Sequence, residues 1–266
     1  MTVDERTRRV LDIMYPDPPV KLTSDNHPIW INPKPDAQPL LTKAAFAEAA
    51  SALQGQIKRT PLLELKELSA LAGKRVFIKD EAHQNGGSFK ARGVYYEILV
   101  AIEKIIRTPG DRALLRKGLK IVTQSTGNHG IALIRSVTKI VQVLSEKYRG
   151  DPELASNIRK IEPVVFTLKN LPAVKRRDMQ AALDDYRTVL NTRRGKLEGT
   201  FADYDDALRA RATYIKERQG AALYMDHSGD DIMLGHGSAG IEIAQQLAEA
   251  GIAPDQKVAL IIPVGA

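Results

Sequence analysis

The stretch LKIVTQSTGNHGIALIRSVTKIVQVL, Leu119 to Leu144, decides the fold. It begins with a short β-branched run that predicts a strand, passes through a polar loop containing glycine, and continues with apolar residues at helical spacing. Segments of the strand type and of the helix type alternate on both sides of it. Because such alternation builds parallel sheets covered by helices, the sequence predicts an α/β fold of open, parallel, twisted sheets with flanking helices.

Several flanking segments are each expected to form one element. Residues 1 to about 40 are rich in proline and predict an extended arm, and Thr42 is the expected N-cap of the helix that follows. The residues around 144–160 predict one elongated surface helix. Strands are expected over 75–81, 162–168, 187–192, 221–227 and 257–266, and helices from about Ser88 and over 173–186, 203–220 and 237–251.

Length and composition bound the class of protein. With 266 residues, 43% hydrophobic, the chain can bury the cores of two domains. We expect a larger domain from 1–116 plus 222–266, a smaller one from 117–221, and a cofactor cleft between them. The chain contains no cysteine, which excludes disulfides and thiolate metal sites. The acidic stretch 226–231 lacks the spacing of a calcium loop, so no metal is expected.

The net charge of +7 does not indicate a nucleic-acid partner. The basic residues are dispersed, and their densest group, 175–177, is followed by acidic residues. A mild positive field of this kind suits small anionic ligands. No apolar run approaches the roughly 18–20 residues that span a bilayer, and the first residues do not resemble a secretory signal, so we expect a cytoplasmic protein with no membrane partner.

One lysine lies in an unusual context. The stretch NGGSFKARG, Asn85 to Gly93, places Lys90 behind flexible glycines and at the start of an expected helix. A nucleophilic lysine must be held close to a carbonyl and partly desolvated, and glycines allow that close approach. Local chemistry alone favours a phosphate-binding lysine or an ordinary residue of the first helical turn over a nucleophile.

The loop QSTGNHG, Gln124 to Gly130, lies between the expected strand and helix. Its hydroxyl and amide groups, together with the backbone N–H groups of a helix N-terminus, can bind a carboxylate. An ordinary strand-to-helix turn is the alternative. Together the two stretches offer an amine and an oxyanion cradle.

Four motifs in the same order resemble one known family. KDEAHQNGGSFKARG (79–93) resembles the K-x-E-x-x-Q-x-x-G-S-F-K-x-R-G signature of the serine/threonine dehydratases and serine racemases, and QSTGNHG is similar to their S-S-G-N-H loop. KRTPLLELKELSALAGKRVFIK (58–79) and DHSGDDIMLGHGSAGIEI (226–243) are similar to two further motifs. These are enzymes of fold type II that depend on pyridoxal 5′-phosphate.

The resemblance implies a role for each residue at a matching position. Lys90 is then the Schiff-base lysine, Phe89 packs near the cofactor ring, and Asn128 hydrogen-bonds the phenolic oxygen of the cofactor. The substrate carboxylate is taken by the loop that contains Ser125, Thr126, Asn128 and His129. The implied enzyme is a homodimer that acts on an amino acid.

The implied reaction is deamination of serine or threonine by α,β-elimination, with Lys90 removing the α-proton. Thr126 stands where racemising members carry a second serine as the acid or base of the opposite face. Threonine keeps the hydroxyl but adds a methyl, so Lys90 and Thr126 are the expected catalytic residues and elimination is favoured over racemisation. A threonine here also resembles the D-serine dehydratases, which leaves the handedness of the substrate open.

The resemblance stops at the C-terminal PVGA, where Gly265 begins the expected phosphate loop. The rest of that loop would lie beyond Ala266, so we expect a C-terminally truncated chain whose activity is weak. The alternatives are a remnant that binds an amino acid or a partner without turnover and, less favoured by the motifs, a β-replacement enzyme of the same fold.

Overall fold

A computed structural model describes residues 41–218, 220–225 and 227–253. The chain divides into two units, Met1–Leu40 and Leu41–Ala266, and all described residues belong to the second. The expected proline-rich arm, the expected strand over 257–266 and Gly265 lie outside the described residues. The division into a larger and a smaller domain at 116/117 and 221/222 stays a prediction.

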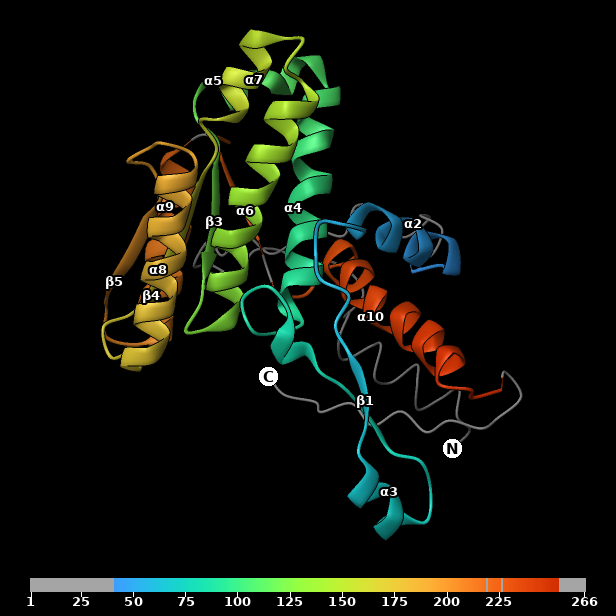
Figure 1. The fold of residues 1–266 in the computed structure, drawn as a ribbon. Coiled ribbons are helices and arrows are strands. Elements are labelled where there is room, and N and C mark those ends of the chain that lie inside the picture. The colour runs from blue at the N-terminus through green and yellow to red at the C-terminus, as the bar shows by residue number, and fades with distance from the viewer. Residues whose placement is uncertain (1–40, 219, 226, 254–266) are drawn as a thin grey trace, which may run out of the picture. The chain divides into compact units, whose positions relative to one another are not determined.

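The described part of the chain contains a parallel sheet of four strands, in the order β5-β4-β3-β6 (Figure 1). β3 (Lys120–Gln124) pairs on one side with β4 (Glu162–Leu168) and on the other with β6 (Ala222–Tyr224), and β5 (Lys196–Phe201) pairs with β4. Lys120 stands opposite Glu162 in one neighbour and Ala222 in the other. The predicted α/β fold with a parallel sheet is confirmed.

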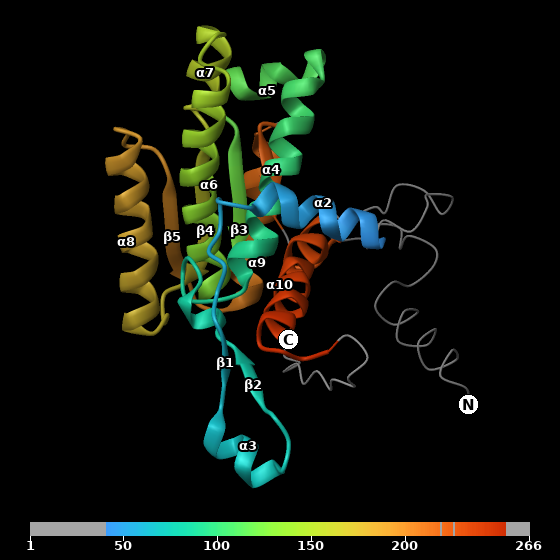
Figure 2. The same cartoon turned by 45° about the vertical axis from the view of Figure 1, so that its right-hand side comes forward.

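Helices cover both faces of this sheet, which explains why its central strands are almost wholly buried. α6 (Asn128–Lys147) and α8 (Ala173–Val189) pack on one face, and α9 (Tyr204–Glu217) packs on the other (Figure 2). The side chains of successive residues in a strand point to opposite faces of the sheet. Ile121 belongs to the core under α6, whereas Val122 belongs to the core under α9.

The segment that carries Lys90 leads into α4 (Lys90–Arg107), which packs against α6 and α10 (Asp230–Glu249). α2 (Lys43–Leu53) packs on α10, and Thr42 caps it as predicted. A Cβ on Gly93 would lie 2.5 Å from the Ile232 carbonyl oxygen, and one on Gly235 would lie 2.7 Å from the Gly93 Cα. The two glycines therefore let α4 and α10 cross with their backbones in contact.

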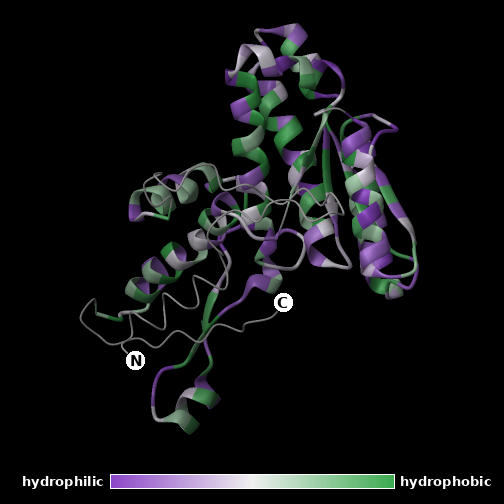
Figure 3. Cartoon of the chain, turned by 180° about the vertical axis from the view of Figure 1, so that it is seen from behind, coloured by the Kyte–Doolittle hydropathy of each residue, from purple (hydrophilic) through white to green (hydrophobic). Residues whose placement is uncertain are grey.

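An antiparallel pair, β1 (Leu62–Glu64) and β2 (Phe77–Lys79), precedes the Lys90 segment. α3 (Lys66–Ala72) connects the two strands and ends at Gly73, whose left-handed φ of 61° suits a glycine that closes a helix. Several large apolar side chains of this region are exposed, among them Leu71, which is 85% exposed. The ribbon of this region is partly green, the colour of hydrophobic residues, in Figure 3.

Three element predictions differ from the structure. No strand forms at 187–192, because α8 runs through Val189 to keep Tyr186 in the core, where its hydroxyl donates to the Ile161 carbonyl; the strand forms at β5 instead. The elongated helix around 144–160 is two helices, because Asp151 caps α7 (Pro152–Ile158) with proline at its first position. α10 begins at 230 rather than at 237, because Gly235 lies inside the helix, where it allows close contact with α4.

The remaining short elements are α5 (Arg112–Arg116) and the 3₁₀ turns η1 (Glu81–His83) and η2 (Pro109–Asp111). Within the described ranges, no helix has the length and apolar character that crossing a membrane requires.

Candidate active site

Lys90 is the first residue of α4 and follows two glycines in left-handed conformation. Gly86 and Gly87 have φ values of 89° and 74°, which residues with a side chain rarely adopt. The Lys90 Nζ lies 4.6 Å from the ring centroid of Phe89, a side chain that is 44% exposed. Among the described residues, no carboxylate forms an ion pair with Lys90. Its amine is therefore half-buried, uncompensated and bordered by an aromatic face.

The buried His129 and the half-buried His236 lie close enough to Lys90 for its charge to affect them. Burial, followed by the charges of His227 and Lys90, lowers the pKa of His129 to about 3. Burial, followed by the charges of Lys90 and Arg92, lowers the pKa of His236 to about 4. Both imidazoles are therefore neutral at neutral pH. His129 stacks on His227 with ring centroids 4.0 Å apart, and the Nδ1 of His236 accepts a hydrogen bond from the Gly93 amide.

Two buried polar atoms near Lys90 have no hydrogen-bond partner within the described part of the chain. They are the hydroxyl oxygen of Ser88 and the Nε2 of His129. An interaction with the backbone of Met225 acts against burial and raises the pKa of His129. Buried polar atoms are normally satisfied, so this pair fits a site that receives a polar ligand.

The loop between β3 and α6 has its own hydrogen bonds. The hydroxyl oxygen of Ser125 accepts from the amides of Gly127 and Gly130, at 3.2 and 2.9 Å, so Ser125 is buried and stabilises the start of α6. Thr126 is exposed at the tip. The Asn128 Oδ1 accepts a hydrogen bond from the Nζ of Lys175 at 2.5 Å.

The backbone of this loop offers donors for an anion. In the part of the chain that the structure describes, the N–H groups of Thr126, Asn128 and His129 have no acceptor. The first N–H groups of a helix are unpaired by its geometry, and the helix dipole there favours negative charge. The four residues predicted for the substrate loop thus lie together at the carboxyl end of β3, and His129 brings that loop to Lys90. Their individual roles stay predictions.

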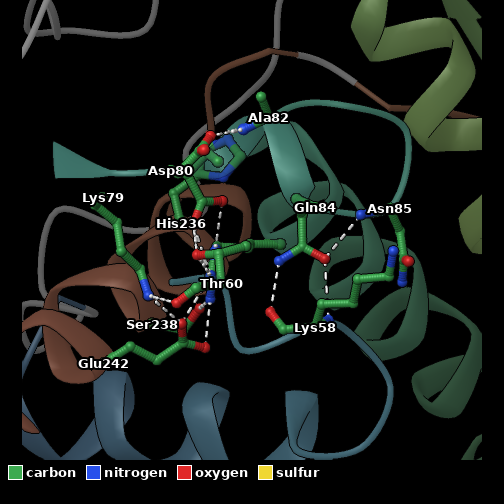
Figure 4. A network of polar contacts seen from close by, with 12 residues as sticks. Lys58, Thr60, Lys79, Asp80, Ala82, Gln84, Asn85, His236, Ser238 and Glu242 are labelled. Atoms are coloured by element: carbon green, nitrogen blue, oxygen red, sulfur yellow. Dashed lines mark hydrogen bonds and ion pairs between the residues drawn. The ribbon is translucent and has the colours of Figure 1, made fainter. Parts of the chain in front are cut away.

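A buried polar network supports the Lys90 segment (Figure 4). Arg92, fully buried two residues after Lys90, donates to both oxygens of Glu81 at 2.8 and 2.9 Å. It also donates to both oxygens of Glu242 on α10, at 2.8 and 2.9 Å. The two carboxylates keep Arg92 charged and raise its pKa, although burial alone would lower it. The first turn of α4 is therefore fixed from two sides.

Lys79 and Thr60 complete this network. The Nζ of Lys79 donates to Glu242, to Gln246 and to the Thr60 carbonyl, at 2.7, 2.7 and 2.8 Å. The Thr60 hydroxyl donates to Glu81 at 2.6 Å. Two cations thus balance two carboxylates, and although burial raises the pKa of Glu242, the hydrogen bonds from Arg92 and Lys79 bring it below its usual value.

The polar residues of the four motifs therefore have different tasks. In the lysine signature, Arg92 binds Glu81, and both Arg92 and Lys79 bind Glu242. These side chains hold the segment in place rather than facing a ligand. Gln84 of the same signature donates to and accepts from the backbone of Lys58. Sequence reasoning named neither Lys175 nor His227 as a site residue. The basic group at 175–177 was the available signal for the first, and the motif at 226–243 was the signal for the second.

A cavity of about 380 Å³ lies beside the Lys90 segment and shares Asn85 and Ala91 with it. Three basic residues line it: Lys58, Arg135 and Lys139. Lys90 and the loop at Ser125–His129 do not line it, so this cavity is separate from the candidate active site.

Comparison with known proteins gives one consistent answer. Residues 53–136 match the family model described as "Pyridoxal-phosphate dependent enzyme". The chain is 26% identical over 225 residues to a serine racemase of Dictyostelium discoideum, covering 85% of this chain and 54% of the relative. It is 25% identical over 230 residues to the L-threonine ammonia-lyase of Thermotoga maritima, covering 85% of this chain and 44% of that enzyme. The chain thus spans about half the length of these relatives.

The fold leads to the same group of proteins. The apo crystal structure of diaminopropionate ammonia lyase from Escherichia coli superposes with a TM-score of 0.60 at 19% identity, covering 83% of this chain and 56% of that one. At this identity the likeness shows the fold alone. The match of residues 53–136, the sequence relatives and the fold agree with the resemblance of the four motifs to the pyridoxal-phosphate dependent enzymes of the serine racemase and threonine dehydratase family.

Proposed function

We propose that this chain binds pyridoxal 5′-phosphate through Lys90 and deaminates a hydroxy-amino acid, such as serine or threonine, to a 2-oxo acid and ammonia. The observation that carries the proposal is the pairing of an uncompensated lysine, reached through two left-handed glycines, with a neutral buried histidine from the anion loop. The ammonia-lyases and racemases among the similar proteins support it.

The residues present fit the cofactor. Lys90 would hold it covalently through Nζ, Phe89 would lie against its ring, and Asn128 would donate to its phenolic oxygen. The hydroxyl oxygen of Ser88 and the Nε2 of His129 are buried polar atoms that have no hydrogen-bond partner among the residues that the structure describes, so a ligand could satisfy them. When bound, pyridoxal phosphate supplies an electron sink for the charge that develops at the α-carbon.

Lys90 is the proposed base for the α-proton of the substrate. Its surroundings suit that task, because no carboxylate of the described residues forms an ion pair with its Nζ, which stays available to the substrate. The neutral imidazoles of His129 and His236 add no second full positive charge beside it. Loss of the α-proton and of the β-hydroxyl group as water leaves an enamine, which is hydrolysed to the 2-oxo acid and ammonia.

The substrate carboxylate is proposed to bind at the N-terminus of α6. The N–H groups of Thr126, Asn128 and His129 are the available donors there. Charge-assisted hydrogen bonds of this kind contribute about 1.5–3 kcal/mol each, so the loop can orient the α-carbon toward Lys90.

Racemisation is the second candidate function, because serine racemases are among the sequence relatives. It requires a proton donor on the face of the substrate opposite Lys90. The Thr126 hydroxyl, exposed at the loop tip, is the proposed group. The remaining alternative is a chain that binds an amino acid or a partner without turnover.

The test begins with the covalent bond. The protein is incubated with pyridoxal phosphate, reduced with borohydride and digested, and the modified lysine is identified by mass spectrometry. We expect modification of Lys90 in the wild type and its loss in Lys90→Ala, with Lys104→Ala of the same helix as the matched control. Ammonia, 2-oxo acid and the optical antipode are then assayed with L- and D-serine and L- and D-threonine.

Absence of a cofactor adduct at Lys90 would refute the cofactor role. An adduct without ammonia release, but with inversion of serine, would favour racemisation. An adduct with neither product would support the remaining alternative, a chain that binds an amino acid or a partner without turnover.

A further inference from the structure

Lys175 lies over the anion loop. It is the third residue of α8, which packs on α6, and its Nζ contacts the Asn128 Oδ1 at 2.5 Å. Its aliphatic chain covers Gly127, where an added Cβ would lie 3.9 Å from the Lys175 Cε. Among the described residues, no carboxylate forms an ion pair with Lys175. The only hydrogen bond described for its ammonium is thus the one to Asn128.

This contact fixes which way the Asn128 amide is turned. The two ends of an asparagine amide are nearly isosteric, and a neighbour usually decides between them. An ammonium group has three donors and no acceptor, so only the amide oxygen can face it. The NH₂ group of Asn128 is therefore directed away from Lys175, and a ligand on that side meets donors rather than an acceptor.

We infer that Lys175 is a positioning residue for the cofactor: it holds the Asn128 amide with its N–H donors available to the phenolic oxygen of pyridoxal phosphate. The inference rests on the proposed function, because it needs the cofactor to be bound at Lys90. The phenolic oxygen carries negative charge, and a donor stabilises it, whereas an amide oxygen would repel it. Lys175 thus acts on the cofactor through Asn128.

Two other roles of Lys175 predict different results. If Lys175 only joined α8 to α6, its loss would lower the melting temperature without changing the bound cofactor. If it bound the substrate carboxylate directly, its loss would raise KM and leave cofactor affinity unchanged. A role through Asn128 changes cofactor affinity and the pH titration of the cofactor's visible absorbance, and it disappears when Asn128 is already absent.

The experiment uses the full chain, titrated with pyridoxal phosphate and followed by visible absorbance. Lys175→Met keeps the aliphatic chain and removes the donor, Lys175→Arg keeps a donor, and Lys175→Glu supplies an acceptor that turns the amide around. Lys169→Met, an exposed lysine of the loop before α8, removes the same charge without touching Asn128. Together with Lys175→Met, the single variant Asn128→Ala and the double variant that carries both changes complete a double-mutant cycle.

We expect Lys175→Met to weaken cofactor binding about tenfold, the effect of losing one hydrogen bond to a charged group. Lys175→Arg restores most of the affinity, and Lys175→Glu loses more than Lys175→Met. The pH midpoint of the visible band rises in Lys175→Met, because the donor stabilises the phenolic oxygen most when the neighbouring nitrogen has lost its proton. The double variant is no weaker than Asn128→Ala alone, and Lys169→Met stays within about twofold of the wild type.

Wild-type affinity and an unshifted pH midpoint in Lys175→Met would overturn this inference alone. Additive losses in the double variant would also overturn it, because they would show that Lys175 acts independently of Asn128. No cofactor binding by the wild type would overturn the proposed function and this inference with it. Melting temperatures without cofactor distinguish a folding defect, and an equal loss in Lys169→Met would assign the effect to net charge.

Discussion

Replacing Arg92 with methionine should destabilise the protein strongly. The guanidinium is fully buried and makes four hydrogen bonds to Glu81 and Glu242 at 2.8–2.9 Å. Methionine fills much of the volume but leaves both carboxylates without this partner. Lys79 still pairs with Glu242, so the larger loss falls on Glu81, which keeps only the Thr60 hydroxyl in the network.

The expected magnitude follows from the burial of this pair. Removing one partner of a buried ion pair costs about 3–5 kcal/mol, because the remaining charge is poorly solvated. The matched control is Arg59→Met, since Arg59 makes an ion pair of similar length, 2.7 Å, with Glu249, but the two side chains are 47% and 63% exposed. Solvent screens such a pair, so the control should change stability only slightly.

The assay is urea unfolding of the full chain, followed by circular dichroism and fluorescence, with the free energies compared at equal slope. Arg92→Lys should be intermediate, because lysine keeps the charge but cannot bind two carboxylates bidentately. Equal losses in Arg92→Met and Arg59→Met would refute the reasoning, since burial would then not determine the strength of the network.

Three further predictions concern other parts of the fold. Gly93→Ala should destabilise the protein by about 1–3 kcal/mol, because the added methyl group overlaps α10 at the helix crossing, although alanine favours helices. Gly240→Ala in α10 is the control: no atom lies within 4 Å of an added Cβ, so the change should be neutral or stabilising. Equal free energies of unfolding for the two variants would contradict this. Tyr186→Phe should cost about 1–3 kcal/mol by leaving a buried carbonyl unpaired, and an unchanged urea midpoint would count against that hydrogen bond. The pKa of His129 is lowered to about 3 in the folded state, so the unfolded state binds the proton first as the pH falls. The free energy of unfolding should therefore decrease as the pH drops from about 6.5 toward 3, and His129 should add no pH dependence above that window. In urea titrations at several pH values, His129→Gln should reduce this dependence of stability on pH, and an unaltered dependence would show that the imidazole is not buried in its neutral form.

Local patterns identified much of the fold and the main candidates for the site. The β-branched run of β3 and the helical spacing of α6 are local properties, so the unit at 120–147 was predicted correctly. The left-handed Gly73 and the cap at Thr42 are also local. The strand placed at 187–192 was wrong, because Tyr186 extends α8 through a contact with Ile161, which is distant in the sequence.

By itself, the sequence determined the class of fold and supplied the motifs of the resemblance, because strand period, helix period and the motif around Lys90 are properties of neighbouring residues. Only the tertiary structure decided what the other residues do. It turned Ser125 onto the start of α6, buried Arg92 between two carboxylates and brought Lys175 to Asn128. The physical reason is that burial and the choice of hydrogen-bond partner depend on contacts between distant segments, such as the 47 residues that separate Lys175 from Asn128.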